Sequence, residues 1–205
     1  VSMGIYIFSW PVLKEALIKL QDEPGCDFGK HIIPYIHERG DKVFAYEYNG
    51  YWKDVGTLQS YWEANMELID IVPEFNLYEE YWKIFTKTDI IPPHYVASTA
   101  HIEKSIISEG SEIYGEVTGS IIGAGVLIEE GAVVRDSIVM RDCHIGRNTK
   151  LYKTIVAEHT TIGENCEVGI GDYAESEYDR KVYNSELVII GEKSVIPGNI
   201  RIGKN

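Results

Sequence analysis

One aspartate stands where a carboxylate could take part in phosphate chemistry. Asp54 ends an alternating segment, in the run Tyr-Trp-Lys-Asp-Val-Gly-Thr at residues 51–57, and Gly56 allows the backbone to turn sharply just after it. A carboxylate at the end of a strand is placed to hold Mg²⁺, which uses one or two carboxylates together with phosphate oxygens. A surface carboxylate at a strand end is the simpler interpretation of Asp54 taken by itself, so both interpretations stay open.

Asp27 and two histidines suggest other chemistry. Asp27 precedes a predicted helix, where a side-chain oxygen can cap the helix, and a carboxylate can also accept hydrogen bonds from two adjacent hydroxyls. The two roles exclude one another only if they use the same oxygens. His144 and His159 could each act as the base of an acyltransferase. Both lie beside inward aliphatic positions at predicted corners, where polar residues are simply solvated, which favours a structural role.

The elements that would position Asp27 and Asp54 alternate between strands and helices. Apolar or alternating segments predict strands at residues 3–8, 42–48 and 51–55, the last two joined by the tight turn Asn49-Gly50. Apolar spacings of three and four predict helices over residues 9–20, 29–39 and 57–71. We expect Ser9 to cap the first helix and Pro34 to kink or shorten the second. This order is typical of part of an α/β layer.

Residues 72–100 lack a clear period and contain three prolines and many aromatic residues. Large aromatic side chains are not expected to be left in water, so this linker or collar is predicted to pack on another surface. The aromatic residues concerned are Phe75, Tyr78, Tyr81, Trp82 and Phe85.

Aliphatic residues recur every six positions in the second half, and the pattern as a whole repeats every 17 residues. The three series are 122, 139, 156; 128, 145, 162; and 134, 151, 168, with Ile, Val or Leu at every position. Neither a helix nor a single strand gives this period, whereas a triangular coil with one inward aliphatic residue on each face does. Small residues at 132, 143, 149, 160 and 166 fit tight corners, and glycines at 123, 146 and 163 fit the points where the chain leaves a face.

The repeat is interrupted by the polar residues 171–185 and resumes at Ile190, Ile196 and Ile202. An interruption in a solenoid predicts a loop that leaves one face, either solvated or in contact with another domain or subunit. The pattern predicts a parallel β-helix over residues 101–205. A β-sandwich of short strands is disfavoured, because sandwiches do not hold a 17-residue step over three turns.

Composition narrows the possible partners. The chain has 19 basic and 32 acidic residues, a net charge of −13, which argues against nucleic acid and anionic membrane surfaces as partners. A phosphate substrate would then need a divalent cation. No apolar stretch approaches the roughly 18 residues of a membrane span. Three cysteines form neither a disulfide framework nor a metal knuckle, so we expect a cytoplasmic location.

Three motifs together carry a resemblance to a known family. They are Ser-Met-Gly-Ile-Tyr at residues 2–6, Asp-Phe-Gly-Lys at 27–30 with Ile-Pro at 33–34, and Gly-Tyr-Trp-Lys-Asp-Val-Gly-Thr at 50–57 followed by Tyr-Trp-Glu-Ala-Asn at 61–65. With the hexapeptide pattern, they make the whole chain resemble the C-terminal half of a bacterial glucose-1-phosphate adenylyltransferase (ADP-glucose pyrophosphorylase). The resemblance implies an α/β remnant of a Rossmann-like nucleotidyltransferase domain at residues 1–71, a linker or collar at 72–100, and a left-handed parallel β-helix at 101–205.

The resemblance also implies an activity. Enzymes of this family join ATP and glucose 1-phosphate to give ADP-glucose and pyrophosphate for glycogen or starch synthesis, usually as homotetramers under allosteric control. Their nucleotide-binding loop lies upstream of the matched region, so this chain alone is expected not to catalyse. A non-catalytic regulatory subunit of the same family and, less favoured, a hexapeptide acyltransferase are the alternatives. Asp54, which such regulatory subunits tend to lose, favours a catalytic parent.

Site residues follow from the same resemblance. Asp54 would be the catalytic carboxylate that holds Mg²⁺, together with a second aspartate from the other half of the enzyme. Asp27 would bind sugar hydroxyls. The remaining candidates for the sugar site are one hydroxyl residue and three aromatic residues: Ser2, Tyr6, Phe28 and Trp52.

Overall fold

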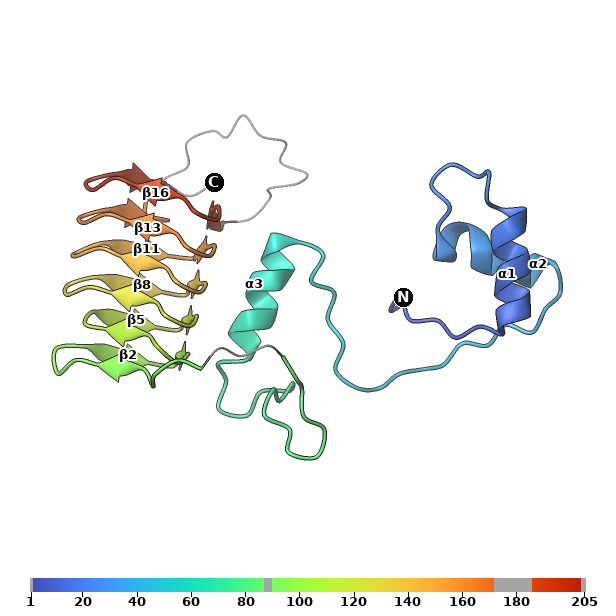
Figure 1. Ribbon diagram of the computed structural model, residues 1–205, viewed down its shortest axis with the longest axis horizontal. Helices are drawn as coiled ribbons and strands as arrows, with labels where there is room; N and C mark the ends of the chain where they lie inside the picture. Colours follow the sequence, from blue (N-terminus) through green and yellow to red (C-terminus); the bar gives the residue numbers. More distant parts are fainter. Residues whose placement is uncertain (1, 87–89, 172–185, 204–205) are drawn as a thin grey trace. The chain divides into compact units, whose positions relative to one another are not determined.

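The chain folds into two compact units, Val1–Asp54 and Val55–Asn205. The computed structural model describes residues 2–86, 90–171 and 186–203 (Figure 1). Helices make up the regular structure of the first unit, and a β-helix dominates the second. Within the described ranges, no helix combines the length and the hydropathy that crossing a bilayer would require.

The first unit is built around three consecutive helical segments. These are α1 (Trp10–Lys19), the π-helix η1 (Phe28–Ile32) and α2 (Ile33–Glu38). Their contact buries Ala16, Ile32 and Ile36 in a small apolar core. Pro11 lies in the first turn of α1, but the Ser9 side chain makes no capping hydrogen bond, so the predicted cap is wrong.

The strands predicted at residues 3–8, 42–48 and 51–55 are absent from the described residues of this unit. Several of their apolar side chains remain in solvent, with Ile7 98% and Phe44 85% exposed. A strand is stabilised by hydrogen bonds to a neighbouring strand, and the described residues 2–54 supply no such neighbour. The three strand predictions are therefore wrong for this chain, although helices form within the ranges predicted for them.

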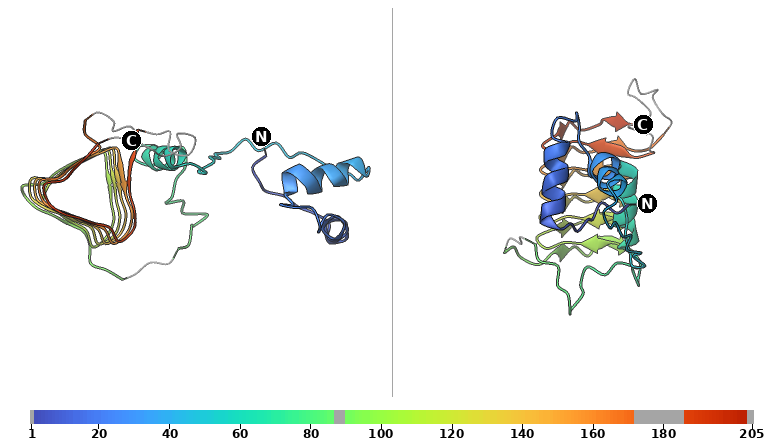
Figure 2. Two further views of the ribbon diagram at one scale, coloured as in Figure 1. Left: turned by 90° about the horizontal axis from the view of Figure 1, so that it is seen from above. Right: turned by 90° about the vertical axis from the view of Figure 1, so that its right-hand side faces the viewer.

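The second unit is a triangular parallel β-helix with three flat sheets (Figure 2). Sheet A contains β1 (Tyr95–Val96), β4 (Glu112–Ile113), β7 (Leu127–Ile128), β10 (His144–Ile145), β13 (Thr161–Ile162) and β16 (Val195–Ile196). Sheet B contains β2 (His101–Glu103), β5 (Glu116–Thr118), β8 (Val133–Arg135), β11 (Lys150–Tyr152), β14 (Glu167–Val168) and β17 (Arg201–Ile202). Sheet C contains β3 (Ile106–Ile107), β6 (Ile121–Ile122), β9 (Ile138–Val139), β12 (Thr154–Val156) and β15 (Val188–Ile190).

The predicted 17-residue register is confirmed. Ile145 pairs with Ile128 and Ile162 in sheet A, Leu151 with Val134 and Val168 in sheet B, and Val139 with Ile122 and Val156 in sheet C. All nine side chains are at most 1% exposed. After the interruption, Ile190, Ile196 and Ile202 rejoin the same columns. The predicted loop itself, residues 171–185, lies outside the described residues except for Gly171.

The corners of the coils add hydrogen bonds to the apolar core. Thr149 Oγ1 donates to the carbonyl oxygen of Gly163 at 2.6 Å, and Cys143 Sγ donates to that of Ala157 at 3.1 Å. Burial raises the pKa of the Cys143 thiol, which keeps it a protonated donor. A β-carbon on Gly146 would lie 2.6 Å from the backbone of Gly163. The predicted small residues and glycines are therefore required by close contact between successive coils.

Helix α3 (Leu58–Glu67) lies along the outside of sheet C (Figure 2). Thr57 and Ser60 form a reciprocal cap at its start: the Thr57 and Ser60 side chains each accept a hydrogen bond from the other residue's amide at 3.1 Å. Outward-facing isoleucines in sheet C provide the apolar surface it covers: Ile138 and Ile155 are both 3% exposed. The Nε1–H group of Trp62 also donates to the carbonyl oxygen of Asp136 at 2.8 Å.

The aromatic residues after α3 do not pack as predicted. Tyr81, Trp82 and Phe85 are 97%, 84% and 89% exposed. The apolar residues on the outside of sheet C pack against α3, and these three side chains do not belong to that cluster. Helix α3 belongs to the second compact unit, while the proposed three-part division at residues 71 and 100 stays a prediction.

Candidate functional site

The start of η1 holds Asp27 through several hydrogen bonds. Oδ1 of Asp27 accepts from the Lys30 amide at 2.8 Å, which confirms the predicted cap. The Asp27 carbonyl oxygen accepts from the amides of His31 and Ile32 at 2.9 and 3.2 Å. The Asp27 amide donates to Nδ1 of His31 at 3.0 Å. Among the described residues, Oδ2 of Asp27 has no hydrogen-bond partner, so the cap leaves one carboxylate oxygen available to a ligand.

Ser2, Tyr6 and Phe28 lie together in the first unit. The Tyr6 and Phe28 rings stack with centroids 5.9 Å apart and planes 14° from parallel, and Phe8 packs against both rings. The hydroxyl oxygens of Ser2 and Tyr6 are 2.8 Å apart and form a hydrogen bond. Phe28 is 39% exposed, so part of its face remains open to a ligand.

Gly29 lies between these aromatic residues and Asp27. A β-carbon at this position would lie 3.4 Å from Oδ1 of Asp27 and 3.8 Å from the Tyr6 hydroxyl oxygen. Asp27 and the Ser2–Tyr6 hydroxyl pair therefore approach the same small region. We call Ser2, Tyr6, Asp27 and Phe28 the hydroxyl cluster. A carboxylate, two hydroxyls and an aromatic face suit a ligand with several hydroxyl groups.

Trp52 and Asp54 lie on a segment without regular secondary structure, residues 51–56, near the end of the first unit. Both side chains are exposed, and because no strand forms at residues 51–55, Asp54 does not end a strand as predicted. Among the described residues, no group of three or more His, Cys, Asp or Glu side chains could hold a metal ion. Mg²⁺ commonly uses one or two carboxylates, so Asp54 fits only a site completed by other ligands.

The β-helix histidines pair with carboxylates that the sequence analysis did not single out. Nε2 of His144 lies 2.9 Å from Oε1 of Glu129, and Oε2 of Glu129 accepts from the Arg147 amide at 2.9 Å. The hydrogen bond with His144 is the main cause of the lowered pKa of Glu129. Nδ1 of His159 lies 3.6 Å from Oδ2 of Asp142. Each pair joins residues 15 or 17 positions apart, so the 17-residue repeat could have suggested them.

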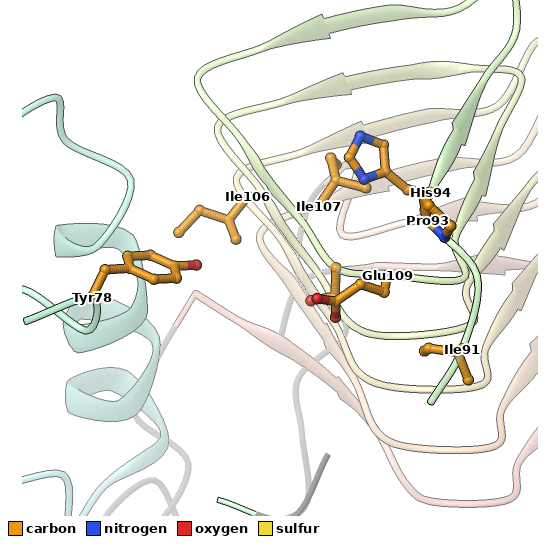
Figure 3. Close-up of a pocket in the computed structure, with 8 residues that line it drawn as sticks. Tyr78, Ile91, Pro93, His94, Ile106, Ile107 and Glu109 are labelled. Atoms are coloured by element: carbon orange, nitrogen blue, oxygen red, sulfur yellow. The ribbon is translucent and has the colours of Figure 1, made fainter. Parts of the chain in front are cut away.

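A pocket of about 410 Å³ lies at the first coil of the β-helix (Figure 3). Tyr78 points toward Ile106 from the segment after α3, and the Glu109 carboxylate points into the same space. The full lining is Tyr78, Ile91, Pro93, His94, Ile106, Ile107, Ser108 and Glu109. This lining includes none of the predicted site residues.

Two family models match the chain. The nucleotidyl transferase model matches residues 1–71, and the model of the GlmU-like C-terminal hexapeptide matches residues 94–190. With the parallel pairing of the strands, they confirm the predicted fold class, a nucleotidyltransferase remnant followed by a left-handed parallel β-helix. The class is thus a nucleotidyltransferase segment joined to a hexapeptide domain.

Curated relatives show which enzymes the chain is similar to. Proteins named glucose-1-phosphate adenylyltransferase match over the whole chain: that of Lachnospira eligens is 66% identical over 204 residues, that of Acetivibrio thermocellus 48% over 206, and that of Thermotoga maritima 47% over 207. The chain's similarity is therefore to glucose-1-phosphate adenylyltransferases, as the motifs predicted. The chain spans about half the length of these relatives, 48% of the first two and 49% of the third. These shares do not say which half is matched, so the C-terminal assignment stays a prediction.

Proposed function

We propose that this chain is part of a glucose-1-phosphate adenylyltransferase, which joins ATP and glucose 1-phosphate to give ADP-glucose and pyrophosphate. The observation that carries the proposal is the match over the whole chain, at 66% identity to the first relative. The succession of a nucleotidyl transferase match and a hexapeptide match along the chain supports it. ADP-glucose synthesis places the enzyme in glycogen or starch biosynthesis.

In this proposal the hydroxyl cluster binds the glucose ring. Asp27 uses Oδ1 for the helix cap and keeps Oδ2 for sugar hydroxyls, so its two roles use different oxygens. The stacked rings of Tyr6 and Phe28 provide an apolar wall for the face of the sugar ring that carries C–H groups, and Ser2 adds a hydroxyl. Trp52, 42% exposed, would add a second aromatic face.

Asp54 would supply one carboxylate to a divalent cation, Mg²⁺ in this proposal. When bound, such an ion neutralises charge on the phosphates as the sugar phosphate oxygen attacks. The exposed position of Asp54 fits a ligand shared with phosphate oxygens and with a carboxylate from the rest of the enzyme. The 19 basic residues of the chain are outnumbered by 32 acidic ones, so a metal ion is also favoured to offset the charge of two phosphate substrates.

We further propose a cytoplasmic homo-oligomer, a tetramer in the complete enzyme, with no nucleic-acid or membrane partner. The acidic composition supports the last point, because phosphate backbones and anionic lipids attract clustered Lys and Arg. The acyltransferase alternative is not favoured. His144 and His159 each lie beside a carboxylate on the outside of the β-helix, and neither lines the described pocket.

Substitution of the two aspartates in the complete, active enzyme tests the proposal. Asp54→Asn keeps the side-chain volume but removes a negative charge from the metal site, so we expect kcat to fall about 10²–10³-fold. Asp27→Asn preserves the cap acceptor and alters contacts to hydroxyls away from the reacting phosphorus, so it should mainly raise KM for glucose 1-phosphate.

Steady-state kinetics, with Mg²⁺ and sugar phosphate varied separately, measure both effects. Asp22→Asn, at an exposed position in the same unit, is the matched control and should behave as the unsubstituted enzyme. Near-normal turnover of Asp54→Asn at saturating Mg²⁺ would show that Asp54 is only a surface carboxylate.

A further inference from the structure

The side chain of His31 accepts a hydrogen bond from the backbone amide of Asp27, a group that the backbone of the helix leaves without a partner. The amide of a residue that precedes a helix has no partner within the helix. Here the Asp27 amide donates to Nδ1 of His31 at 3.0 Å, while Oδ1 of Asp27 accepts from the Lys30 amide at 2.8 Å. The two bonds run in opposite directions across the first turn of η1, so they restrain both the backbone and the side chain of Asp27.

The restraint is anchored in the core of the first unit. Ile32, next to His31, is 1% exposed and packs with Ala16 and Ile36. His31 itself is half-buried, whereas Asp27 and Phe28 are exposed. His31 therefore connects the exposed start of η1 to its buried end.

The orientation of Asp27 affects the aromatic wall as well. Phe28 follows Asp27 directly, and its ring stacks on Tyr6 at a centroid distance of 5.9 Å. A rotation of the backbone at Asp27 would move Oδ2 and also disturb this stack. The one hydrogen bond that Nδ1 of His31 accepts from the Asp27 amide thus restrains two members of the hydroxyl cluster.

We infer that His31 is a positioning residue for sugar recognition: its unprotonated Nδ1 holds the Asp27 amide, so that Asp27 and Phe28 are preorganised for glucose 1-phosphate. The inference rests on the proposed function, since it assigns the hydroxyl cluster to the sugar. The chemical requirement at position 31 is a hydrogen-bond acceptor. Asn carries an acceptor oxygen on a short side chain, whereas Leu has similar bulk and no acceptor.

The test compares His31→Leu with His31→Asn in the complete, active enzyme. Loss of one hydrogen bond should raise KM for glucose 1-phosphate about 2–12-fold in His31→Leu, with kcat and KM for ATP within about twofold of normal. His31→Asn should restore KM for glucose 1-phosphate to within about twofold. His37→Leu, at an exposed position in α2, is the matched control and should leave all three constants unchanged.

Amide hydrogen exchange at Asp27 supplies a readout that does not depend on activity. His31→Leu should accelerate this exchange, and His31→Asn should keep it slow. Unchanged exchange in His31→Leu would overturn the hydrogen bond on which the inference depends. Faster exchange with an unchanged KM would overturn positioning, while a raised KM in Asp27→Asn would leave the proposed function standing. If neither His31→Leu nor Asp27→Asn changed KM, the assignment of the cluster to sugar would be wrong, and the inference with it.

Discussion

Ile145 provides the sharpest test of how the β-helix is stabilised. Its side chain is 0% exposed and lies in sheet A between Ile128 and Ile162, one coil below and one coil above. We consider Ile145→Ala, which removes three carbon atoms from the middle of the stacked column without adding a polar group.

The expected cost follows from burial and rigidity. Transfer of three buried carbons contributes about 2.4 kcal/mol at about 0.8 kcal/mol for each. The cavity adds to this, and the measured range for such substitutions is about 2–5 kcal/mol. Backbone hydrogen bonds on all three faces fix the spacing of successive coils, so neighbouring coils cannot collapse into the cavity that the substitution leaves. We therefore expect a loss near the upper part of that range, about 4 kcal/mol.

Equilibrium urea unfolding of the 205-residue chain, followed by far-UV circular dichroism, measures the loss. Ile145→Val should cost about 0.5–1.5 kcal/mol, and the control Val195→Ala, in the same sheet but 75% exposed, should cost less than about 0.5 kcal/mol. A free energy of unfolding for Ile145→Ala within about 0.5 kcal/mol of the unsubstituted chain would refute a rigid, close-packed column.

Two further predictions concern contacts made outside the coil. Trp62→Phe removes the hydrogen bond to the Asp136 carbonyl oxygen and should weaken the packing of α3 on sheet C by about 0.5–1.5 kcal/mol. Amide hydrogen exchange in α3 should then be faster. Unaltered exchange would show that apolar contact alone holds the helix. The pKa of Glu129 is lowered chiefly by the hydrogen bond of its carboxylate with His144. The ionised carboxylate therefore stabilises the fold above the usual carboxyl range, and this stabilisation is lost as the pH falls through the lowered pKa. The stability difference between the unsubstituted chain and Glu129→Gln should therefore shrink between about pH 6 and pH 3 in urea titrations, and a constant difference would contradict the assignment.

The candidate site was only partly predictable. The sequence indicated that Asp27 could cap a helix or bind hydroxyls, and the structure shows the cap on Oδ1 with Oδ2 left over. It did not indicate His31, whose Nδ1 accepts the hydrogen bond of the Asp27 amide at the start of the π-helix η1. A regular α-helix had been expected there, and the period of apolar residues does not distinguish the two.

The sequence by itself determined the β-helix. The inward positions of the three columns are aliphatic, several tight corners carry a small residue, and a coil contacts mainly the coils next to it. A 17-residue period therefore specifies the register of Ile128, Ile145 and Ile162 directly. Tertiary structure alone decided the rest. Residues 3–8 have the composition of a strand, yet a strand requires a neighbour that local sequence cannot supply. The apolar spacing of residues 58–67 predicted the helix α3 but not the surface on which it packs. That surface includes Ile138 and Ile155, which lie side by side only because the coils of the β-helix stack.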